Sequence, residues 1–266
     1  MTPAAPVAVF DSGLGGLWVL HEIRAHLPAE DLLYLADSEW CPYGPRPRDE
    51  VRERSVQVGR WLQGHGAKML VVACNTASGA ALEALREALE IPVVGMEPAV
   101  KPAVRDTRAG RIGVLATEGT LASERFARLL RDHCADVRVL ARPGTGLVEM
   151  VEGGRLEGDA LRGVLEPVLA PFREAEVDTL VLGCTHYPFL ASAIGEVLGP
   201  DVRLVDSAPA IARQTRRVLE ERGLLAAGGE GRVRILTTGD PAAVGEVVAR
   251  MWREPAAVEG SEIEHT

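Results

Sequence analysis

Two cysteines of this 266-residue chain stand at the ends of apolar segments, each followed at once by polar residues. Cys74 lies in the segment Lys68–Ser78 and Cys184 in the segment Thr179–Pro188. A Val- and Leu-rich segment bounded by polar residues is typical of a buried parallel strand. A thiol just past such a strand lies where open α/β sheets bind ligands. The matched pair predicts one substrate held between two thiols, with acid–base chemistry from both sides.

The polar residues that follow the two cysteines support this chemistry. Asn75 and Thr76 follow the first, and Thr185 and His186 follow the second. Ser, Thr and Asn satisfy free N–H groups where helices begin. A helix N-terminus also favours anions and lowers the pKa of a cysteine, so the same geometry would make a thiolate base and bind a carboxylate. His186 is able to hold or relay a proton. Ordinary helix caps beside buried cysteines remain the alternative.

The segment after the first apolar run carries a second candidate. Asp11 follows the expected strand Val7–Phe10 and precedes Gly13-Leu14-Gly15-Gly16. These glycines allow a tight turn and close backbone approach, but they lack the spacing and the lysine of nucleotide-binding motifs. A carboxylate at the strand end is able to bind an ammonium group or orient a thiol. Asp37 also follows a strand, and Tyr43 and Gly44 lie in a proline-rich loop that is expected to be rigid.

Composition excludes several classes of protein. Hydrophobic residues make up 47% and charged residues 25% of the chain, as in ordinary globular proteins. No apolar run approaches the roughly 18 residues of a membrane helix, and the N-terminal residues do not resemble a signal peptide, so we expect no membrane association and a cytoplasmic protein. The net charge of −9 argues against general nucleic-acid binding. The substrate can still be an anion, because backbone N–H groups bind anions without basic side chains.

The cysteine and lysine positions predict no cofactor. The four cysteines are Cys41, Cys74, Cys134 and Cys184. None forms a C-x-x-C pair, and no metal-ligand spacing is present. The two lysines, Lys68 and Lys101, lie in no recognisable cofactor motif. We therefore expect neither a metal nor pyridoxal phosphate to be required.

Strand and helix patterns alternate along the chain, which predicts a mostly parallel sheet. Besides the first strand and those before the two cysteines, the expected strands are Leu32–Leu35, Ile91–Gly95, Arg111–Leu115, Val137–Leu140, Val202–Val205 and Val233–Leu236. The expected helices end near Leu27 in the first case and otherwise span about 49–63, 76–89, 121–132, 147–152, 160–174, 190–198, 210–222 and 242–252. The acidic segment 255–266 has no periodicity, which predicts a frayed end.

The two halves of the chain resemble each other in outline. Val7–Ser12 matches Gly113–Thr117 as a strand that ends in a hydroxyl residue, and each is followed downstream by one strand-cysteine element. This predicts two pseudo-symmetric α/β lobes with the site in the cleft between them. A single doubly wound domain is the alternative.

Four short motifs together resemble one known family. Asp11-Ser12-Gly13, Pro42-Tyr43-Gly44, Cys74–Ala77 and Gly183–Pro188 are similar to the motifs of glutamate racemase, which belongs to the cofactor-independent aspartate/glutamate racemase superfamily. The resemblance covers about residues 7–208. It implies a first lobe of residues 1–98 plus 207–266 and a second lobe of residues 99–206. It also implies interconversion of L- and D-glutamate without a cofactor, a supply of D-glutamate for peptidoglycan, and leaves a homodimer open.

The resemblance assigns roles to individual residues. Cys74 and Cys184 match the catalytic bases, and Asp11 and His186 match residues that assist the thiols. The positions that match substrate-binding residues are Asp11, Ser12, Tyr43, Gly44, Asn75, Thr76, Thr185 and His186. Glu152 resembles a further acidic position of the site, with Asp37 and Thr117 as additional candidates. The chain departs from the usual family pattern at Ala36, Trp40, Cys41, Ala116 and Phe126, which affects the expected pocket rim.

Racemisation requires a proton to leave Cα on one face and another to arrive on the opposite face. Two thiols on opposing lobes meet this need if one is thiolate while the other is protonated. By resemblance, Cys74 deprotonates D-glutamate and Cys184 deprotonates L-glutamate. Three other functions remain open: a racemase of aspartate or another acid, a hydrolase in which one cysteine forms an acyl-enzyme, and a two-lobed binding module without catalysis.

Overall fold

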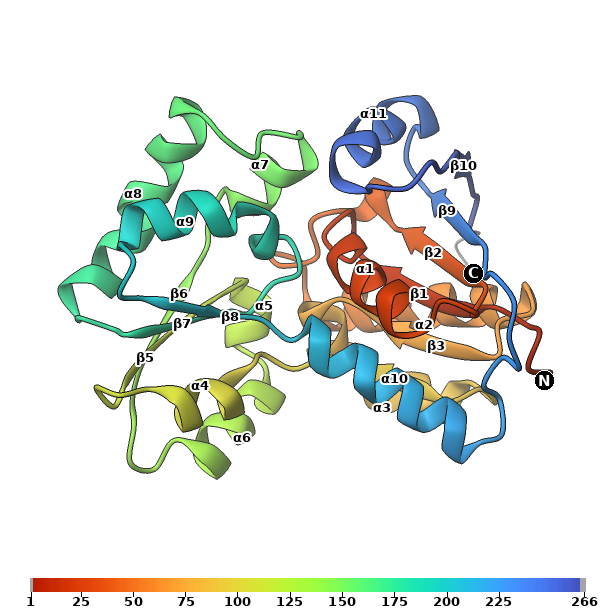
Figure 1. Cartoon of the computed structure of the whole chain (residues 1–266), viewed down its shortest axis with the longest axis horizontal. Helices are drawn as coiled ribbons and strands as arrows, with labels where there is room; N and C mark the ends of the chain where they lie inside the picture. Colours follow the sequence, from red (N-terminus) through yellow and green to blue (C-terminus); the bar gives the residue numbers. More distant parts are fainter. Residues whose placement is uncertain (1, 264–266) are drawn as a thin grey trace.

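Ten strands form two separate sheets in the computed structural model, which describes residues 2–263. Figure 1 shows one sheet in each half of the molecule, with helices packed around both. Every strand pair among the described residues is parallel. The predicted α/β class with two mostly parallel sheets is therefore confirmed.

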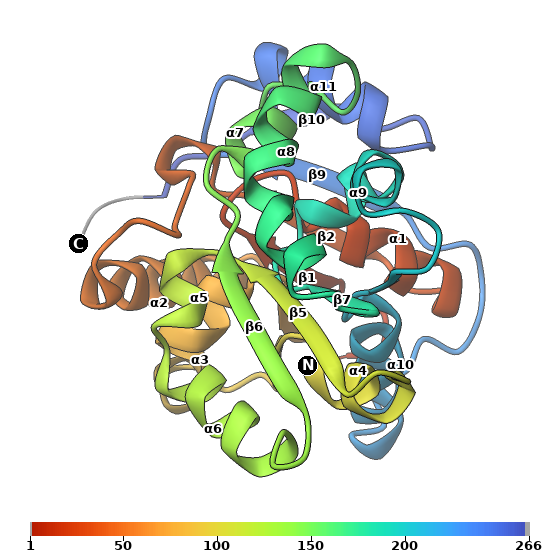
Figure 2. The same ribbon diagram turned by 90° about the vertical axis from the view of Figure 1, so that its left-hand side faces the viewer.

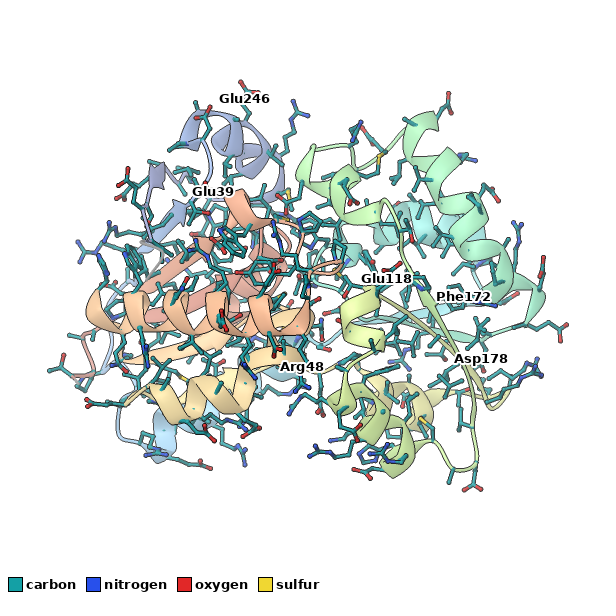
Figure 3. All side chains as sticks on the ribbon, turned by 180° about the vertical axis from the view of Figure 1, so that it is seen from behind. Glu39, Arg48, Glu118, Phe172, Asp178 and Glu246 are labelled. Atoms are coloured by element: carbon teal, nitrogen blue, oxygen red, sulfur yellow. The ribbon has the colours of Figure 1, made fainter. Side chains whose placement is uncertain are left out.

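The first sheet has six strands in the order β10-β9-β2-β1-β3-β4. These strands are β1 (Val7–Asp11), β2 (Leu32–Ala36), β3 (Met69–Val72), β4 (Val93–Gly95), β9 (Val233–Thr237) and β10 (Val258–Gly260). All residues of β1, β2 and β3 are buried, because helices cover both faces of the sheet. Helices α1 (Leu17–His26) and α10 (Ala208–Glu221) pack on one face, and α2 (Arg48–Gly64) and α3 (Asn75–Ala88) cover the other (Figures 1 and 3).

The second sheet has four strands in the order β6-β5-β7-β8. They are β5 (Arg111–Ala116), β6 (Arg138–Pro143), β7 (Thr179–Leu182) and β8 (Arg203–Val205). Figure 2 shows the short helices at the start of this half, α4 (Val100–Asp106), α5 (Glu118–Leu121) and α6 (Glu124–His133), on the side opposite α7 (Leu147–Glu152), α8 (Asp159–Glu174) and α9 (Ala191–Leu198). The order matches β2-β1-β3-β4 strand for strand, so the two cysteine-bearing strands, β3 and β7, hold equivalent places.

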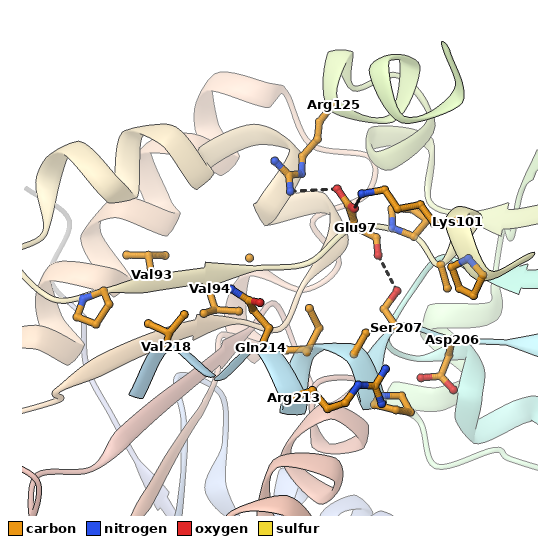
Figure 4. Close-up of a pocket in the computed structure, with 18 of the residues that line it drawn as sticks. Val93, Val94, Glu97, Lys101, Arg125, Asp206, Ser207, Arg213, Gln214 and Val218 are labelled. Atoms are coloured by element: carbon orange, nitrogen blue, oxygen red, sulfur yellow. Dashed lines mark hydrogen bonds and ion pairs between the residues drawn. The ribbon is translucent and has the colours of Figure 1, made fainter. Parts of the chain in front are cut away.

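The chain crosses between the sheets twice, and the two crossings are fastened to each other. Ser207 Oγ donates a hydrogen bond to the carbonyl oxygen of Glu97 at 2.6 Å. The Glu97 carboxylate in turn pairs with Arg125 at 3.3 Å and with Lys101 at 3.1 Å. Figure 4 shows these contacts beside a cavity of about 950 Å³. We propose lobe boundaries at these crossings, between residues 98 and 99 and between residues 206 and 207.

Three local expectations need correction. The expected frayed end contains β10, which pairs with β9 and is held by the Arg234–Glu259 ion pair at 2.8 Å, and the last three residues of that segment, 264–266, lie outside the described part. The helix expected over 121–132 is split into α5 and α6, because Ser123 caps a new helix by accepting from the Phe126 N–H. Helix α4 was not predicted, since its seven residues are too few to show a clear period.

No helix within residues 2–263 combines the length and the apolar character needed to span a bilayer.

Candidate active site

The site is built around the buried carboxylate of Asp11, at the end of β1. Its Oδ1 accepts from the Ser12 N–H at 2.7 Å, and its Oδ2 accepts from the Gly16 N–H at 2.5 Å. Thr185, from the other half of the chain, donates its hydroxyl to Oδ2 at 3.2 Å. Burial raises the pKa of Asp11, although the nearby charge of His186 lowers it. One carboxylate thus links the segments that carry the two candidate bases.

Cys74 lies between β3 and α3 and is itself the N-cap of that helix. Its Sγ accepts from the Ala77 N–H at 3.4 Å and lies 3.7 Å from Ser12 Oγ, to which the thiol donates. Burial and the negative charge of Asp11 raise the pKa of Cys74 well above its usual range, and the contacts with Ala77 and Ser12 only partly oppose this. The residue that caps α3 is therefore Cys74, and not Asn75 or Thr76 as the sequence suggests. The raised pKa favours the thiol form of its side chain in this arrangement.

Cys184 follows β7 and has an imidazole as its partner. His186 Nδ1 lies 3.6 Å from Cys184 Sγ, and His186 Nε2 lies 2.5 Å from Glu152 Oε1. Burial alone would lower the pKa of His186, but hydrogen bonds with Cys184, Cys41 and Glu152 outweigh it and raise this pKa well above its usual value. These contacts favour the protonated form of His186, which lies between the Cys184 sulfur and the Glu152 carboxylate. A 3₁₀ helix (Tyr187–Leu190), rather than an α-helix, follows this motif.

Glu152, the last residue of α7, also reaches across to the first half of the chain. Its Oε1 accepts from the Leu14 N–H at 2.6 Å, in the glycine-rich segment after β1. A Cβ built on Gly15 would lie 2.3 Å from His186 Nδ1, so glycine is needed for the imidazole to pack against this segment. The glycines predicted for close backbone approach therefore approach a catalytic candidate rather than a phosphate.

Three threonines connect the halves on the Cys74 side. Thr76 Oγ1 lies 2.8 Å from Thr117 Oγ1 and 3.4 Å from Thr120 Oγ1. Nearby, the Gly119 N–H donates to the Gly44 carbonyl oxygen at 3.1 Å. The structure thus brings Thr76, Thr117 and Gly44 together at one edge of the site. Thr120 was not singled out from the sequence, because a hydroxyl residue in a short helix gives no signal of its own.

Asn75 supplies an unused polar atom. Its side chain is buried, and its Oδ1 has no hydrogen-bond partner among the described residues. Buried polar atoms are nearly always paired in native proteins. Such an acceptor next to Cys74 is suited to a ligand N–H group.

Asp37 has a different place from the other acidic candidates. Its carboxylate accepts from Arg54 at 2.6 and 2.9 Å, from Tyr43 Oη at 2.6 Å and from Thr238 Oγ1 at 3.0 Å. These contacts use its acceptor positions and hold Tyr43 in place. We therefore propose Asp37 as a positioning residue for the loop that carries Tyr43 and Gly44. Arg54 was missed in the sequence because it lies on a helix rich in exposed charges.

The cavities of the surface add little to this picture. A cavity of about 110 Å³ borders the site and is lined by residues that include Pro42, Gly44, Thr117, Gly144 and Tyr187. The cavity of Figure 4 and another of about 1040 Å³ contain neither Cys74 nor Cys184. The candidate bases therefore lie in a closed arrangement between the two sheets rather than in a large open pocket.

Comparison with known proteins gives one consistent result. Residues 19–215 match the family described as Asp/Glu/Hydantoin racemase. The glutamate racemase of Pseudomonas paraeruginosa is 49% identical over 256 residues, which are 96% of this chain and 97% of that protein.

Solved structures agree over almost the whole chain. Glutamate racemase isoform RacE1 from Bacillus anthracis has a TM-score of 0.89 and 37% identity, covering 97% of this chain and 98% of that one. Escherichia coli glutamate racemase, in complex with L-glutamate and the activator UDP-MurNAc-ala, has a TM-score of 0.87 and 34% identity, covering 98% and 100%.

The buried pair of Arg54 and Asp37 leads to a prediction about stability. Arg54→Leu leaves the Asp37 carboxylate buried without its cation, so the free energy of unfolding should fall by about 3–5 kcal/mol. Urea denaturation followed by circular dichroism measures this. Arg52→Leu is the matched control, since Arg52 lies on the same helix but is exposed, and within residues 2–263 its one ion pair is with the exposed Asp49. Equal stability of the two variants would show that the pair does not hold the loop.

Proposed function

The chain belongs to the Asp/Glu/Hydantoin racemase family, as one of its glutamate racemases, and on this premise we propose that Cys74 and Cys184 are the two bases that exchange the Cα proton of glutamate. The enzyme is thus an isomerase. One observation carries the proposed mechanism: Asp11 binds Ser12, which contacts Cys74, and also binds Thr185, which is adjacent to Cys184. The two thiols are therefore organised around one carboxylate, as a shared substrate requires.

The proton path runs in opposite senses for the two enantiomers. For L-glutamate, the Cys184 thiolate takes the Cα proton and the Cys74 thiol donates its proton to the opposite face, which leaves D-glutamate. For D-glutamate, the roles exchange. His186 assists Cys184 by holding or returning a proton at Nδ1, while Ser12 and Asp11 assist Cys74. A positioned acid or base typically contributes about 10²–10⁴-fold in rate.

The substrate needs anion-binding groups as well as bases, because negative charge develops at Cα during the reaction. We propose that backbone N–H groups at the start of α3, with the hydroxyls of Ser12, Thr76 and Thr185, hold its carboxylates and stabilise this charge. The unpaired Asn75 Oδ1 accepts from the substrate ammonium group. Tyr43 and Gly44 form the rim. The complex of the Escherichia coli protein with L-glutamate supports glutamate as the substrate.

We also propose that the product supplies D-glutamate for peptidoglycan synthesis and that the enzyme works in the cytoplasm without a cofactor. All four cysteines are free thiols, as expected of a protein from a reducing compartment.

The first prediction about the mechanism concerns both proposed bases. Cys74→Ser and Cys184→Ser should each lower racemisation of glutamate by about 10²–10⁴-fold or more, because a serine hydroxyl is a far weaker acid than a thiol and does not form the anion that takes the proton near neutral pH. Circular dichroism of each enantiomer measures turnover, and incorporation of solvent deuterium at Cα distinguishes proton exchange from acyl-enzyme chemistry. Near-normal racemisation by either purified variant would contradict the two-base mechanism.

The second prediction separates the faces of the site. With a substrate analogue that loses a leaving group after Cα deprotonation, only one base is needed. Cys184→Ser should keep elimination from the D analogue and lose it from the L analogue, and Cys74→Ser should do the reverse. If both enantiomers lost elimination equally in each variant, the cysteines would not be separate facial bases.

The third prediction concerns the packing of His186. Gly15→Ala forces the imidazole away from its place, so racemisation should fall by about 10²-fold, the effect expected of a displacement near 1 Å. Gly163→Ala is the control, since no atom lies within 4 Å of a Cβ at that helical position. Unchanged turnover in Gly15→Ala would show that the ring is not held by this contact.

A further inference from the structure

Three side chains that commonly ligate metals converge beside the proposed site. The ligand atoms of Cys41, Glu152 and His186 all lie within 4.8 Å of one another. They come from three separate segments: the loop after the 3₁₀ helix Ser38–Trp40, the end of α7, and the turn after β7. No sequence spacing reveals the group, because its members are more than 30 residues apart along the chain. The proposed proton transfer uses His186, whose Nε2 contacts Glu152, but has no role for Cys41.

The backbone leaves room at this point. A Cβ on Gly13 would lie 2.2 Å from Glu152 Oε1 and 2.8 Å from Cys41 Sγ. Gly13 therefore forms one wall of a narrow space, and the Cys41 thiol and the Glu152 carboxylate both lie next to the position that a Cβ would take there. His186 is buried and has Nε2 turned toward the same carboxylate oxygen. The three ligand atoms thus lie close together beside a backbone that carries no side chain.

The donor set selects the kind of ion. A thiolate, an imidazole and a carboxylate are the ligands of zinc, and three protein ligands with an open fourth position are typical of zinc sites that bind water or a further ligand. Mg²⁺ and Ca²⁺ prefer oxygen donors and do not suit a thiol. The thiolate and carboxylate together balance the 2+ charge, so the filled site is neutral in its partly buried surroundings.

We propose that Cys41, Glu152 and His186 form an inhibitory site for Zn²⁺. The ion takes the place of the proton between His186 and Glu152 and displaces the proton of the Cys41 thiol, so two protons leave as the ion enters. Bonds of about 2.0–2.3 Å from the ion require the 2.5 Å contact between Nε2 and Oε1 to open, and the Cys41 thiol to move inward. His186 and Glu152 are then fixed to the ion and no longer support Cys184.

Binding of the ion is independent of turnover, whereas its inhibitory effect rests on the proposed function. Co²⁺ is a suitable probe, because a thiolate ligand gives Co²⁺ a charge-transfer absorption band. We expect this band when chelator-treated protein is titrated with Co²⁺ in the absence of substrate. The band should disappear in Cys41→Ser and Cys41→Ala. It should persist in Cys134→Ser, because Cys134 follows the last residue of α6 and does not belong to the cluster. Far-ultraviolet circular dichroism confirms that each variant is folded.

Inhibition gives the second measurement. Zn²⁺ should suppress glutamate racemisation reversibly, a chelator should restore it, and Mg²⁺ should have no effect. Relative to the uninhibited rate of each variant, the half-inhibitory Zn²⁺ concentration should rise by more than about tenfold in Cys41→Ser, as expected when a metal site loses an interaction, and should stay unchanged in Cys134→Ser.

Two results would overturn the proposal. One is the absence of a cobalt–thiolate band, and the other is a band and Zn²⁺ sensitivity that survive in both Cys41 variants, which would place the ion on Cys74 or Cys184. A Cys41-dependent band in a protein without racemase activity would instead support the metal site and contradict the proposed function.

Discussion

The buried Asp11 carboxylate is the constraint on which the arrangement of the site depends. A carboxylate removed from water is costly unless its oxygens are paired. Here the pairing comes from both halves of the chain, through the Ser12 and Gly16 N–H groups and the Thr185 hydroxyl. The distance between the two candidate bases is therefore tied to the satisfaction of one buried charge. A movement that separates the sheets at this point must expose Asp11 to water or give it another cationic partner, such as the substrate ammonium group.

The matching strand orders of the two sheets explain why the contacts between them are reciprocal. Asp11 ends β1 and binds Thr185, which follows the cysteine of the other sheet. Thr117 follows β5, the equivalent of β1, and binds Thr76, which follows the cysteine of the first sheet. Each half thus contacts the segment that carries the candidate base of the other. The two reciprocal contacts differ in chemistry, because Thr185 binds the carboxylate of Asp11, whereas Thr76 binds the hydroxyl of Thr117. Cys74 contacts the Ala77 N–H and the Ser12 hydroxyl, and Cys184 contacts the imidazole of His186.

The parts of this structure that could be predicted from sequence are those encoded in short, continuous segments. The apolar strands before Cys74 and Cys184 are buried on both faces, so their composition alone located the strand ends. By contrast, the strand Val258–Gly260 was missed because its three residues are too few to show a period, and pairing with β9 and the Arg234–Glu259 ion pair hold it in place. The ion pair of Arg54 with Asp37 was missed because Arg54 lies on a helix rich in exposed charges and its partner lies in a separate loop. A contact across 17 residues of helix and loop leaves no periodic signal. Long-range partners decide which polar residues enter the site.

The glycines after β1 leave space for side chains of both the candidate active site and the proposed zinc site. Neither Gly13 nor Gly15 has a positive φ, so their role is to lack a side chain rather than to adopt an unusual backbone conformation. At Gly15 this absence admits the imidazole of His186, and at Gly13 it admits the carboxylate of Glu152 together with the Cys41 thiol. Alanine at Gly13 would close the space in which the three ligands meet, but it would also push Glu152 from His186 and from the Leu14 N–H. The space that holds His186 and Glu152 and the proposed zinc site are therefore bounded by the same glycine backbone. Replacement of Cys41 would remove one proposed ligand and leave the contact between Glu152 and His186 in place.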